Sequence, residues 1–168
     1  MSVVTESLEY RYKPPNDSGF LDDVWELKER VRRREGYLCQ SWSFFSRAYN
    51  RNEAYLYIDG DEVVGFATVR NDGYVLFLAV DKSYRGEGVG TSLMERVQDK
   101  HTKLSCHARS SNEGAIGFYK NLGFSVDKYV ERYYQNGDAA YYLTKNTSQS
   151  GSSIRNKITE VLKSDSDD

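Results

Sequence analysis

The sequence YVLFLAVDKSYRGEGVG at residues 74–90 decides the fold, because it joins a nearly unbroken apolar run to a loop with glycine at every second position. An apolar run of this length, rich in Val, Leu and Phe, predicts a strand buried on both faces. Gly86, Gly88 and Gly90 then lead into the helical pattern TSLMERVQDK. The stretch therefore predicts a strand, a loop and a helix in direct succession.

The glycine loop predicts a phosphate-binding site. Glycine has no Cβ atom, so backbone N–H groups can approach phosphate oxygens, and the following helix directs its positive end at them. The spacing G-x-G-x-G differs from the dinucleotide fingerprint G-x-G-x-x-G, and no G-K-[ST] follows as in a P-loop. A flexible strand-to-helix turn is the alternative that the glycines alone leave open.

Length and composition favour one globular domain, since the chain has 168 residues of which 39% are hydrophobic and 29% charged. The formal net charge of −2 offers no basic surface, so we expect no direct contact with nucleic acid or membranes. Two cysteines and two histidines are too few for a disulfide framework or a structural metal site, which indicates a cytoplasmic protein without a metal. No window approaches the ~18 consecutive apolar residues of a membrane span.

Strand and helix patterns alternate along the rest of the chain, as in an α/β (α+β) protein. We expect strands at 8–13, 54–59, 62–70, 74–80, 103–108, 125–134 and 139–145, and helices at 20–34, 42–49, 90–100 and 112–122. Asp17 or Ser18 is a candidate N-cap of the first helix, and Gly36 its stop. The composition turns polar after residue 145, so we expect a domain at 1–145 and a tail at 146–168 with a short helix at 153–163.

Two linked motifs resemble those of the GCN5-related N-acetyltransferases. Arg85 opens R-x-x-G-x-G, and residues 112–124 match N-x-x-A-x-x-F-Y-x-x-x-G-F. The resemblance covers roughly residues 54–145. It implies the fold of that family: a mixed, mostly antiparallel sheet of six to seven strands, about four helices and a splayed central strand pair. It also implies acetyl-CoA as co-substrate, without a metal.

In that family the glycine loop holds the pyrophosphate of acetyl-CoA. The resemblance assigns cofactor binding to Leu78, Ala79, Val80, Arg85, Gly86, Glu87, Gly88, Val89, Gly90, Thr91, Asn112 and Tyr119. The amides of Leu78 and Ala79 would meet the oxyanion, and Asn112 the pantetheine arm. Tyr119 would be catalytic, because its hydroxyl could protonate the departing thiolate.

The segment C-H-A-R-S-S-N at 106–112 is similar to L-x-V-R-x-S-N of the Nα-acetyltransferases. The branch that acts on initiator methionine pairs a histidine with a tyrosine on the preceding strand, and these positions are His107 and Tyr74 here. The resemblance implies that the two are catalytic and relay a proton from the substrate amine through water. An α-amine, whose ordinary pKa is about 7.7 to 8.0, suits a histidine better than a lysine does at about 10.4. A purely structural strand histidine stays open as the alternative.

Paired tyrosines in ERYYQNGDAAYYL are similar to those that bind the substrate backbone in the Nα-acetyltransferases. The resemblance assigns that role to Tyr133 and Tyr134, although G-D-A-A-Y departs from the family's register. Tyr37 lies in the loop that in those enzymes meets the substrate's first side chain, but the family's apolar-proline segment is missing there. Leu76 stands where several relatives have glutamate. Without a carboxylate at this position, His107 and Tyr74 become the more necessary candidates for accepting the proton of the substrate amine.

The resemblance implies an N-acetyltransferase in which the acceptor amine attacks acetyl-CoA directly in a ternary complex. The leading acceptor is a protein N-terminal α-amine. Cys106 should point away from His107 on the strand, which disfavours an acyl-enzyme. One alternative acceptor is a small amine or a lysine, for which Glu35, Asp72 and Glu131 could supply carboxylates. Another is a non-catalytic module that binds acyl-CoA. We expect a monomer or homodimer with a peptide or small amine as its partner.

Overall fold

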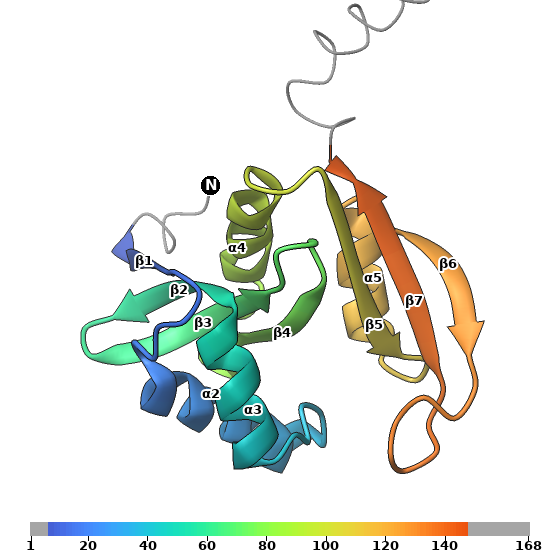
Figure 1. The fold of residues 1–168 in the computed structure, drawn as a ribbon, viewed down its shortest axis with the longest axis horizontal. Coiled ribbons are helices and arrows are strands. Elements are labelled where there is room, and N and C mark those ends of the chain that lie inside the picture. Colours follow the sequence, from blue (N-terminus) through green and yellow to red (C-terminus); the bar gives the residue numbers. More distant parts are fainter. Residues whose placement is uncertain (1–6, 148–168) are drawn as a thin grey trace, which may run out of the picture. The chain divides into compact units, whose positions relative to one another are not determined.

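The computed structural model describes residues 7–147, in which seven strands and four α-helices follow the predicted order (Figure 1). Contacts divide the chain into two units, one ending at Lys100 and the other beginning at His101. The four helices and two antiparallel sheets confirm the expected fold class. The helix expected at 153–163 lies outside the described residues. Within them, no helix is long and apolar enough to cross a membrane.

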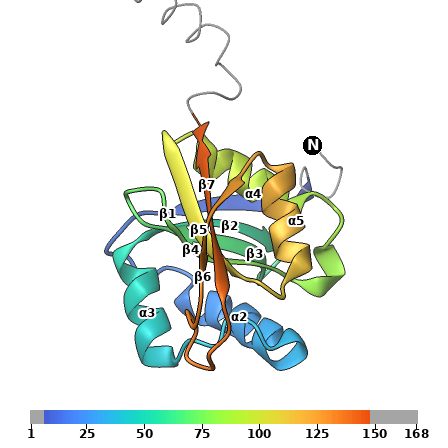
Figure 2. The same cartoon turned by 90° about the vertical axis from the view of Figure 1, so that its right-hand side faces the viewer.

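The first unit is a four-stranded antiparallel sheet in the order β1-β2-β3-β4. Its strands are β1 (Glu9–Lys13), β2 (Glu53–Asp59), β3 (Glu62–Val69) and β4 (Val75–Val80). The helices α2 (Leu21–Glu35) and α3 (Trp42–Arg51) cover one face, and α4 (Val89–Gln98) covers the other (Figures 1 and 2). Successive side chains of β2 point to opposite faces of the sheet. Leu56 joins the core under α2 and α3, whereas the Tyr57 hydroxyl lies 2.5 Å from Ser92 Oγ on α4.

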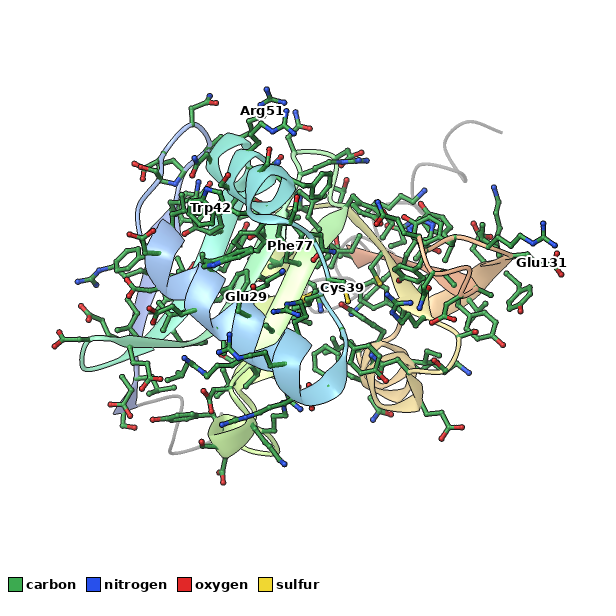
Figure 3. The ribbon with its side chains drawn as sticks, turned by 90° about the horizontal axis from the view of Figure 1, so that it is seen from below. Glu29, Cys39, Trp42, Arg51, Phe77 and Glu131 are labelled. Carbon is green, nitrogen blue, oxygen red and sulfur yellow. The ribbon has the colours of Figure 1, made fainter. Side chains whose placement is uncertain are left out.

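Aromatic packing fixes α3 on the sheet. The ring centroid of Phe45 lies 4.6 Å from that of Phe77 on β4, which Figure 3 labels beneath the helices. Phe45 and Tyr49 are fully buried, as an aromatic core face requires, whereas Trp42 and Phe44 are about half exposed. Ser41 begins the helix by accepting a hydrogen bond from Phe44 N–H at 3.3 Å.

The predicted N-cap of α2 is wrong. The cap position is Phe20, which is left-handed at φ 65° and offers no side-chain cap. Asp17 instead closes a local turn by accepting from Gly19 N–H at 2.7 Å, the alternative that short acidic side chains commonly take. The predicted stop is confirmed, since Gly36 is left-handed at φ 76° and its N–H donates to Arg32 O at 2.9 Å.

Burial alternates along β4, which corrects the expectation of a strand buried on both faces. Val75, Phe77 and Ala79 are buried, whereas Leu76, Leu78 and Val80 are only partly covered. The strand is the last in its sheet, and an antiparallel edge strand needs only one face in the core. An apolar run therefore did not distinguish an edge strand from a central one.

Gly65 on β3 allows α4 to approach the sheet closely. A Cβ atom built there would lie 2.9 Å from Val89 Cγ1 and 3.3 Å from Leu93 Cδ1. Carbon atoms in van der Waals contact lie about 3.5 to 4.0 Å apart. The seat of α4 on the sheet therefore depends on the absence of a side chain at this position.

The second unit is a three-stranded antiparallel sheet in the order β5-β7-β6 with α5 (Glu113–Asn121) beside it (Figure 2). Its strands are β5 (Lys103–Arg109), β6 (Ser125–Val130) and β7 (Ala140–Asn146). The strand predicted to reach residue 134 ends at Val130. Arg132 leaves the extended region at φ 51°, and the N–H groups of Tyr133 and Tyr134 both donate to Asp138 O, so the segment closes on itself as a loop.

Candidate active site

The glycine loop leads into a helix whose N-terminus has no side-chain cap. Gly86 and Gly88 are left-handed at φ 78° and 86°, a conformation that favours glycine, and Gly88 is the N-cap of α4. Residues 85–88 are exposed. The N–H groups of the first turn have no intrahelical acceptor, and the helix dipole adds positive potential there. This geometry suits a phosphate group.

Arg85 ties the loop to α2. Its Nη1 and Nη2 donate to the two carboxylate oxygens of Glu35, the second at 2.9 Å, and its Nε donates to Val80 O at 3.0 Å. These hydrogen bonds hold the pKa of Glu35 below its ordinary value, although burial works in the opposite direction. The sequence predicted a phosphate contact for Arg85 and missed this partner.

Three further hydrogen bonds anchor the start of the loop. Asp81 accepts from Arg30 Nη2 at 3.0 Å and from Ser83 N–H at 3.0 Å. Burial alone would raise the pKa of Asp81, but the hydrogen bonds from Ser83 and Arg30 outweigh it and leave the pKa lowered. The Tyr84 hydroxyl donates to Asp59 on β2. The loop is therefore attached to both the helix α2 and the sheet.

The free edge of β4 presents alternate amides. Asp81 N–H donates to Val64 O at 2.8 Å, so the Asp81 amide points at β3. Since alternate N–H groups of a strand point to opposite edges, the amide of Ala79 also points at β3, and those of Leu78 and Val80 point away from it. Of the two predicted oxyanion donors, Leu78 therefore faces the open edge and Ala79 does not.

Tyr74 directly precedes β4 and shares the half-buried face of Leu76 and Leu78. The guanidinium of Arg70 lies 4.6 Å from its ring centroid, and Arg70 also forms an ion pair of 2.7 Å with Asp72. Asp72 accepts in turn from Tyr74 N–H at 3.3 Å. The ring is thus oriented by a cation that is itself held in place.

The loop between α2 and α3 carries Tyr37 and Cys39 and contacts the core of the first unit. Figure 3 labels Cys39. Tyr37 is partly buried and packs on the core. Leu38 is left-handed at φ 55°, and Cys39 Sγ donates to Gly36 O at 3.2 Å. The fully buried Lys28 donates to Gln40 O, and burial lowers the pKa of this lysine.

In the second unit, His107 lies between two aromatic rings. Its ring is stacked on Tyr133 with centroids 4.1 Å apart and planes at 10°, and the Tyr142 ring lies 4.9 Å away. Burial lowers the pKa of His107 and so favours the uncharged imidazole. Two residues predicted for different roles, His107 and Tyr133, are therefore in direct contact.

Arg109 is a site residue that the sequence reasoning missed. Its guanidinium lies 4.0 Å from the ring centroid of Tyr134 and forms an ion pair of 2.8 Å with Asp138. Burial raises the pKa of Tyr134 to about 12, against the opposing charge of Arg109. Spacing alone could have found Arg109, because residues 107 and 109 share one face of a strand.

Tyr119 and His107 lie on opposite faces of β5. Tyr119, on α5, is buried and hydrogen-bonded to Cys106, whose side chain points away from that of His107. Burial raises the pKa of the Cys106 thiol to about 12. Asn112 caps α5 by accepting from Ala115 N–H at 3.1 Å, as its place before the helical run predicts.

The described residues contain no group of three or more His, Cys, Asp or Glu side chains that could hold a metal ion. Within the first unit, the edge of β4, the loop and the start of α4 are continuous in sequence and space. Within the second, His107, Tyr133 and Tyr134 form one cluster, and Asn112 and Tyr119 belong to α5.

A model described as the acetyltransferase (GNAT) family matches residues 19–124. N-alpha-acetyltransferase 30 of Schizosaccharomyces pombe is 30% identical over 118 residues, which cover 62% of this chain and 73% of that protein. The human N-alpha-acetyltransferase 30 is 34% identical over 102 residues, which cover 53% of this chain. The match spans only 28% of the length of the human protein and of its mouse counterpart.

Solved structures share the fold. The ribosomal-protein-S18-alanine N-acetyltransferase of Escherichia coli aligns over 85% of this chain and 97% of its own, with a TM-score of 0.68 and 21% identity. Arabidopsis thaliana Naa50, in complex with the bisubstrate analogue CoA-Ac-MVNAL, aligns over 82% and 98%, with a TM-score of 0.61 and 23% identity. At these identities the likeness concerns the fold alone.

Proposed function

Because this chain belongs to the acetyltransferase (GNAT) family, we propose that it transfers acetyl from acetyl-CoA to an amine, and that this amine is a protein N-terminal α-amine. The observation that carries the proposal is the start of α4, which has no side-chain cap and follows two left-handed glycines. A helix N-terminus of this kind binds phosphate through backbone N–H groups. We assign it to the pyrophosphate of acetyl-CoA, with the segment from Arg85 to Thr91 as the cofactor loop.

The edge of β4 would bind the acetyl thioester. The amides of Leu78 and Val80 point away from β3 and can donate to the thioester oxygen as it gains negative charge. Asn112 and Tyr119, on and before α5, are assigned to the pantetheine arm and the thioester sulfur. The cofactor is acetyl-CoA, which acts as a co-substrate. The analogue bound to Arabidopsis Naa50 likewise contains CoA and an acetyl group.

The amine nitrogen attacks the thioester carbonyl carbon, and the carbon–sulfur bond then breaks. The proton lost by the amine passes to a base, and the departing thiolate takes a proton from Tyr119. We assign His107 as the base, with Tyr74 in the same proton path. His107 and Tyr119 lie on opposite faces of β5, so we assign the two proton transfers to separate groups.

Several features support a peptide N-terminus as the acceptor. Burial lowers the pKa of His107 and so favours the uncharged form that can accept a proton, and Tyr133 stacks directly on it. We assign Tyr133, Tyr134 and Tyr37 to the substrate peptide. The relative from Schizosaccharomyces pombe that matches over 62% of this chain is named N-alpha-acetyltransferase 30.

The contacts of the candidate acidic residues disfavour a cationic small molecule as the acceptor. Glu35 is paired with Arg85, and Asp72 with Arg70, so neither carboxylate can bind a cation without giving up an arginine. Glu131, labelled in Figure 3, is exposed at the end of β6. We also propose a cytoplasmic location, which the free thiols of Cys39 and Cys106 support, and a monomer or homodimer without a nucleic-acid partner.

The test is acetyl transfer to three matched acceptors: a peptide with a free N-terminus, the same peptide with a blocked N-terminus and an internal lysine, and a polyamine. We expect mass spectrometry to find acetylation of the free N-terminus only. Transfer to lysine or polyamine instead would overturn the acceptor assignment. Binding of acetyl-CoA without transfer to any acceptor would indicate a non-catalytic module.

Tyr119→Phe tests the general acid. We expect kcat to fall about a hundredfold, since proton transfer by a positioned side chain contributes roughly 10²–10⁴-fold. The Kd for acetyl-CoA, measured by calorimetry, should stay near wild type because the ring remains. Tyr129→Phe, at an exposed tyrosine of β6, is the matched control. An unchanged kcat in Tyr119→Phe would remove this residue from the mechanism.

A further inference from the structure

The contacts of Arg85 leave it poorly placed to bind phosphate. Three of its N–H groups are used: two form a fork on the carboxylate of Glu35, and Nε bonds Val80 O. Carboxylate and guanidinium match in geometry, and such bidentate pairs are among the strongest polar contacts in proteins. A phosphate group would meet a guanidinium whose charge Glu35 already balances and that has two N–H groups left, whereas the N–H groups in the first turn of α4 have no intrahelical acceptor.

Glu35 occupies a position that requires a partner. It is the last residue of α2, where the helix dipole is negative and disfavours a carboxylate, and the three residues before it are arginines. The hydrogen bonds from Arg85 keep the pKa of Glu35 low against the effect of burial. The pair is only partly exposed, with 39% of the Arg85 side chain and 29% of the Glu35 side chain accessible.

The pair is one of two ties between α2 and the segment that joins β4 to α4. Arg30 binds Asp81 before the short helical turn Lys82–Tyr84, and Glu35 binds Arg85 after it. Arg85 directly precedes Gly86, the first of the left-handed glycines. The second tie therefore fixes the point from which the chain turns into α4.

We propose that Glu35 and Arg85 together form a positioning pair for the cofactor loop: Arg85 acts on acetyl-CoA by holding the loop through Glu35, and does not bind the pyrophosphate itself. This inference rests on the proposed function, since it assumes that the loop binds the phosphates of acetyl-CoA. It makes Glu35, which the sequence placed in a substrate groove, a determinant of cofactor affinity. It also predicts that a negatively charged residue favours the binding of a negatively charged ligand.

A double-mutant cycle distinguishes the two roles of Arg85. If the pair positions the loop, Glu35→Ala and Arg85→Ala should each weaken CoA binding by roughly five- to tenfold, and the double variant should be no weaker than either, because residues that act as one unit are not additive. If Arg85 binds the pyrophosphate, removal of Glu35 frees a cation, and CoA binding stays unchanged or becomes tighter. That outcome, or additive losses in the double variant, would overturn the inference.

A second substrate separates loop positioning from general damage. S-acetylpantetheine has the thioester without the phosphates, so the ratio of kcat/KM for acetyl-CoA to that for S-acetylpantetheine should fall equally in both single variants. Equal losses with both substrates would mean that the pair merely supports the fold, and would also overturn the inference. Glu35→Asp, which keeps the charge, should restore part of the ratio.

Glu9→Gln is the matched control, since Glu9 forms an exposed ion pair with Arg11 on β1. It should leave CoA affinity unchanged. Failure of the wild-type protein to bind CoA would contradict the proposed function, whereas wild-type binding with an unaffected Glu35→Ala variant would contradict only the positioning pair.

Discussion

The aromatic rings around His107 lie within contact distance of its imidazole, and burial lowers its pKa. A histidine in water has a pKa of about 6.5 and is partly charged near neutral pH. Stacking on Tyr133 and contact with Tyr142 remove it from water, and burial lowers its pKa. The imidazole is therefore ready to accept a proton under conditions in which an exposed histidine would already hold one in part.

The pH dependence of kcat/KM tests this assignment. Both the peptide amine and His107 must be uncharged for the reaction. Below the lowered pKa of His107, kcat/KM therefore falls more steeply with decreasing pH than it would if only the peptide amine titrated. Tyr133→Ala exposes the imidazole, raises its pKa towards the ordinary value and moves this steeper limb to higher pH. Wild type and variant are compared with one peptide, so that the titration of the peptide amine cancels. The same limb in wild type, Tyr133→Ala and His107→Gln would exclude His107 as the base.

The guanidinium of Arg109 contacts the loop at 131–139 at two residues. Arg109 on β5 contacts the ring of Tyr134 and pairs with Asp138, which also accepts the N–H groups of Tyr133 and Tyr134 through its carbonyl. The loop is thus joined to β5 through Arg109 and closed on itself through Asp138. Arg109 is accordingly a positioning residue for the proposed peptide site.

Asp138→Asn should raise the KM for the peptide by about three- to tenfold, because loss of the ion pair loosens the loop that carries both tyrosines. Peptide titrations at saturating acetyl-CoA give the KM, and the Kd for acetyl-CoA should stay at the wild-type value. Glu131→Gln, at an exposed residue of the same loop, is the control. A KM that stays unchanged in Asp138→Asn would mean that the ion pair does not order the site.

How far the sequence predicts an element depends on how local its causes are. Helical spacing in α3 and α4 and the strand patterns of β2 and β3 are properties of a few neighbouring residues, and these predictions are confirmed. The end of β6 and the N-cap of α2 were predicted wrongly, because Arg132 and Phe20 take left-handed conformations that no local pattern marks. The pairing of Glu35 with Arg85 joins residues 50 apart in the sequence, and no local pattern marks it.

On the scale of the whole first unit, Lys13 joins three parts of the chain. Its side chain is buried, and Nζ donates to the carbonyl oxygens of Pro14 at 2.9 Å, Asp17 at 2.7 Å and Asn52 at 2.8 Å. These acceptors belong to the end of β1, the approach to α2 and the junction of α3 with β2. One ammonium group thus satisfies the backbone where several elements end.

Lys13→Met should lower the free energy of unfolding by roughly 2–4 kcal/mol, since each acceptor left unsatisfied costs roughly 1–3 kcal/mol and water can reach some of them. Urea unfolding followed by circular dichroism gives the value. Lys103→Met, at an exposed lysine of β5, should change it by less than about 0.5 kcal/mol. Equal stabilities of the two variants would show that Lys13 does not hold these segments together.

The close approach at Gly65 connects the strand β3 to the helix that carries the proposed phosphate site. Any side chain at this position must move Val89 and Leu93, and both belong to α4. Val89 is the first residue of that helix, so a displaced side chain there shifts the amides assigned to the pyrophosphate. Protein engineers could therefore tune acetyl-CoA affinity through position 65 while leaving every residue of the loop as it is.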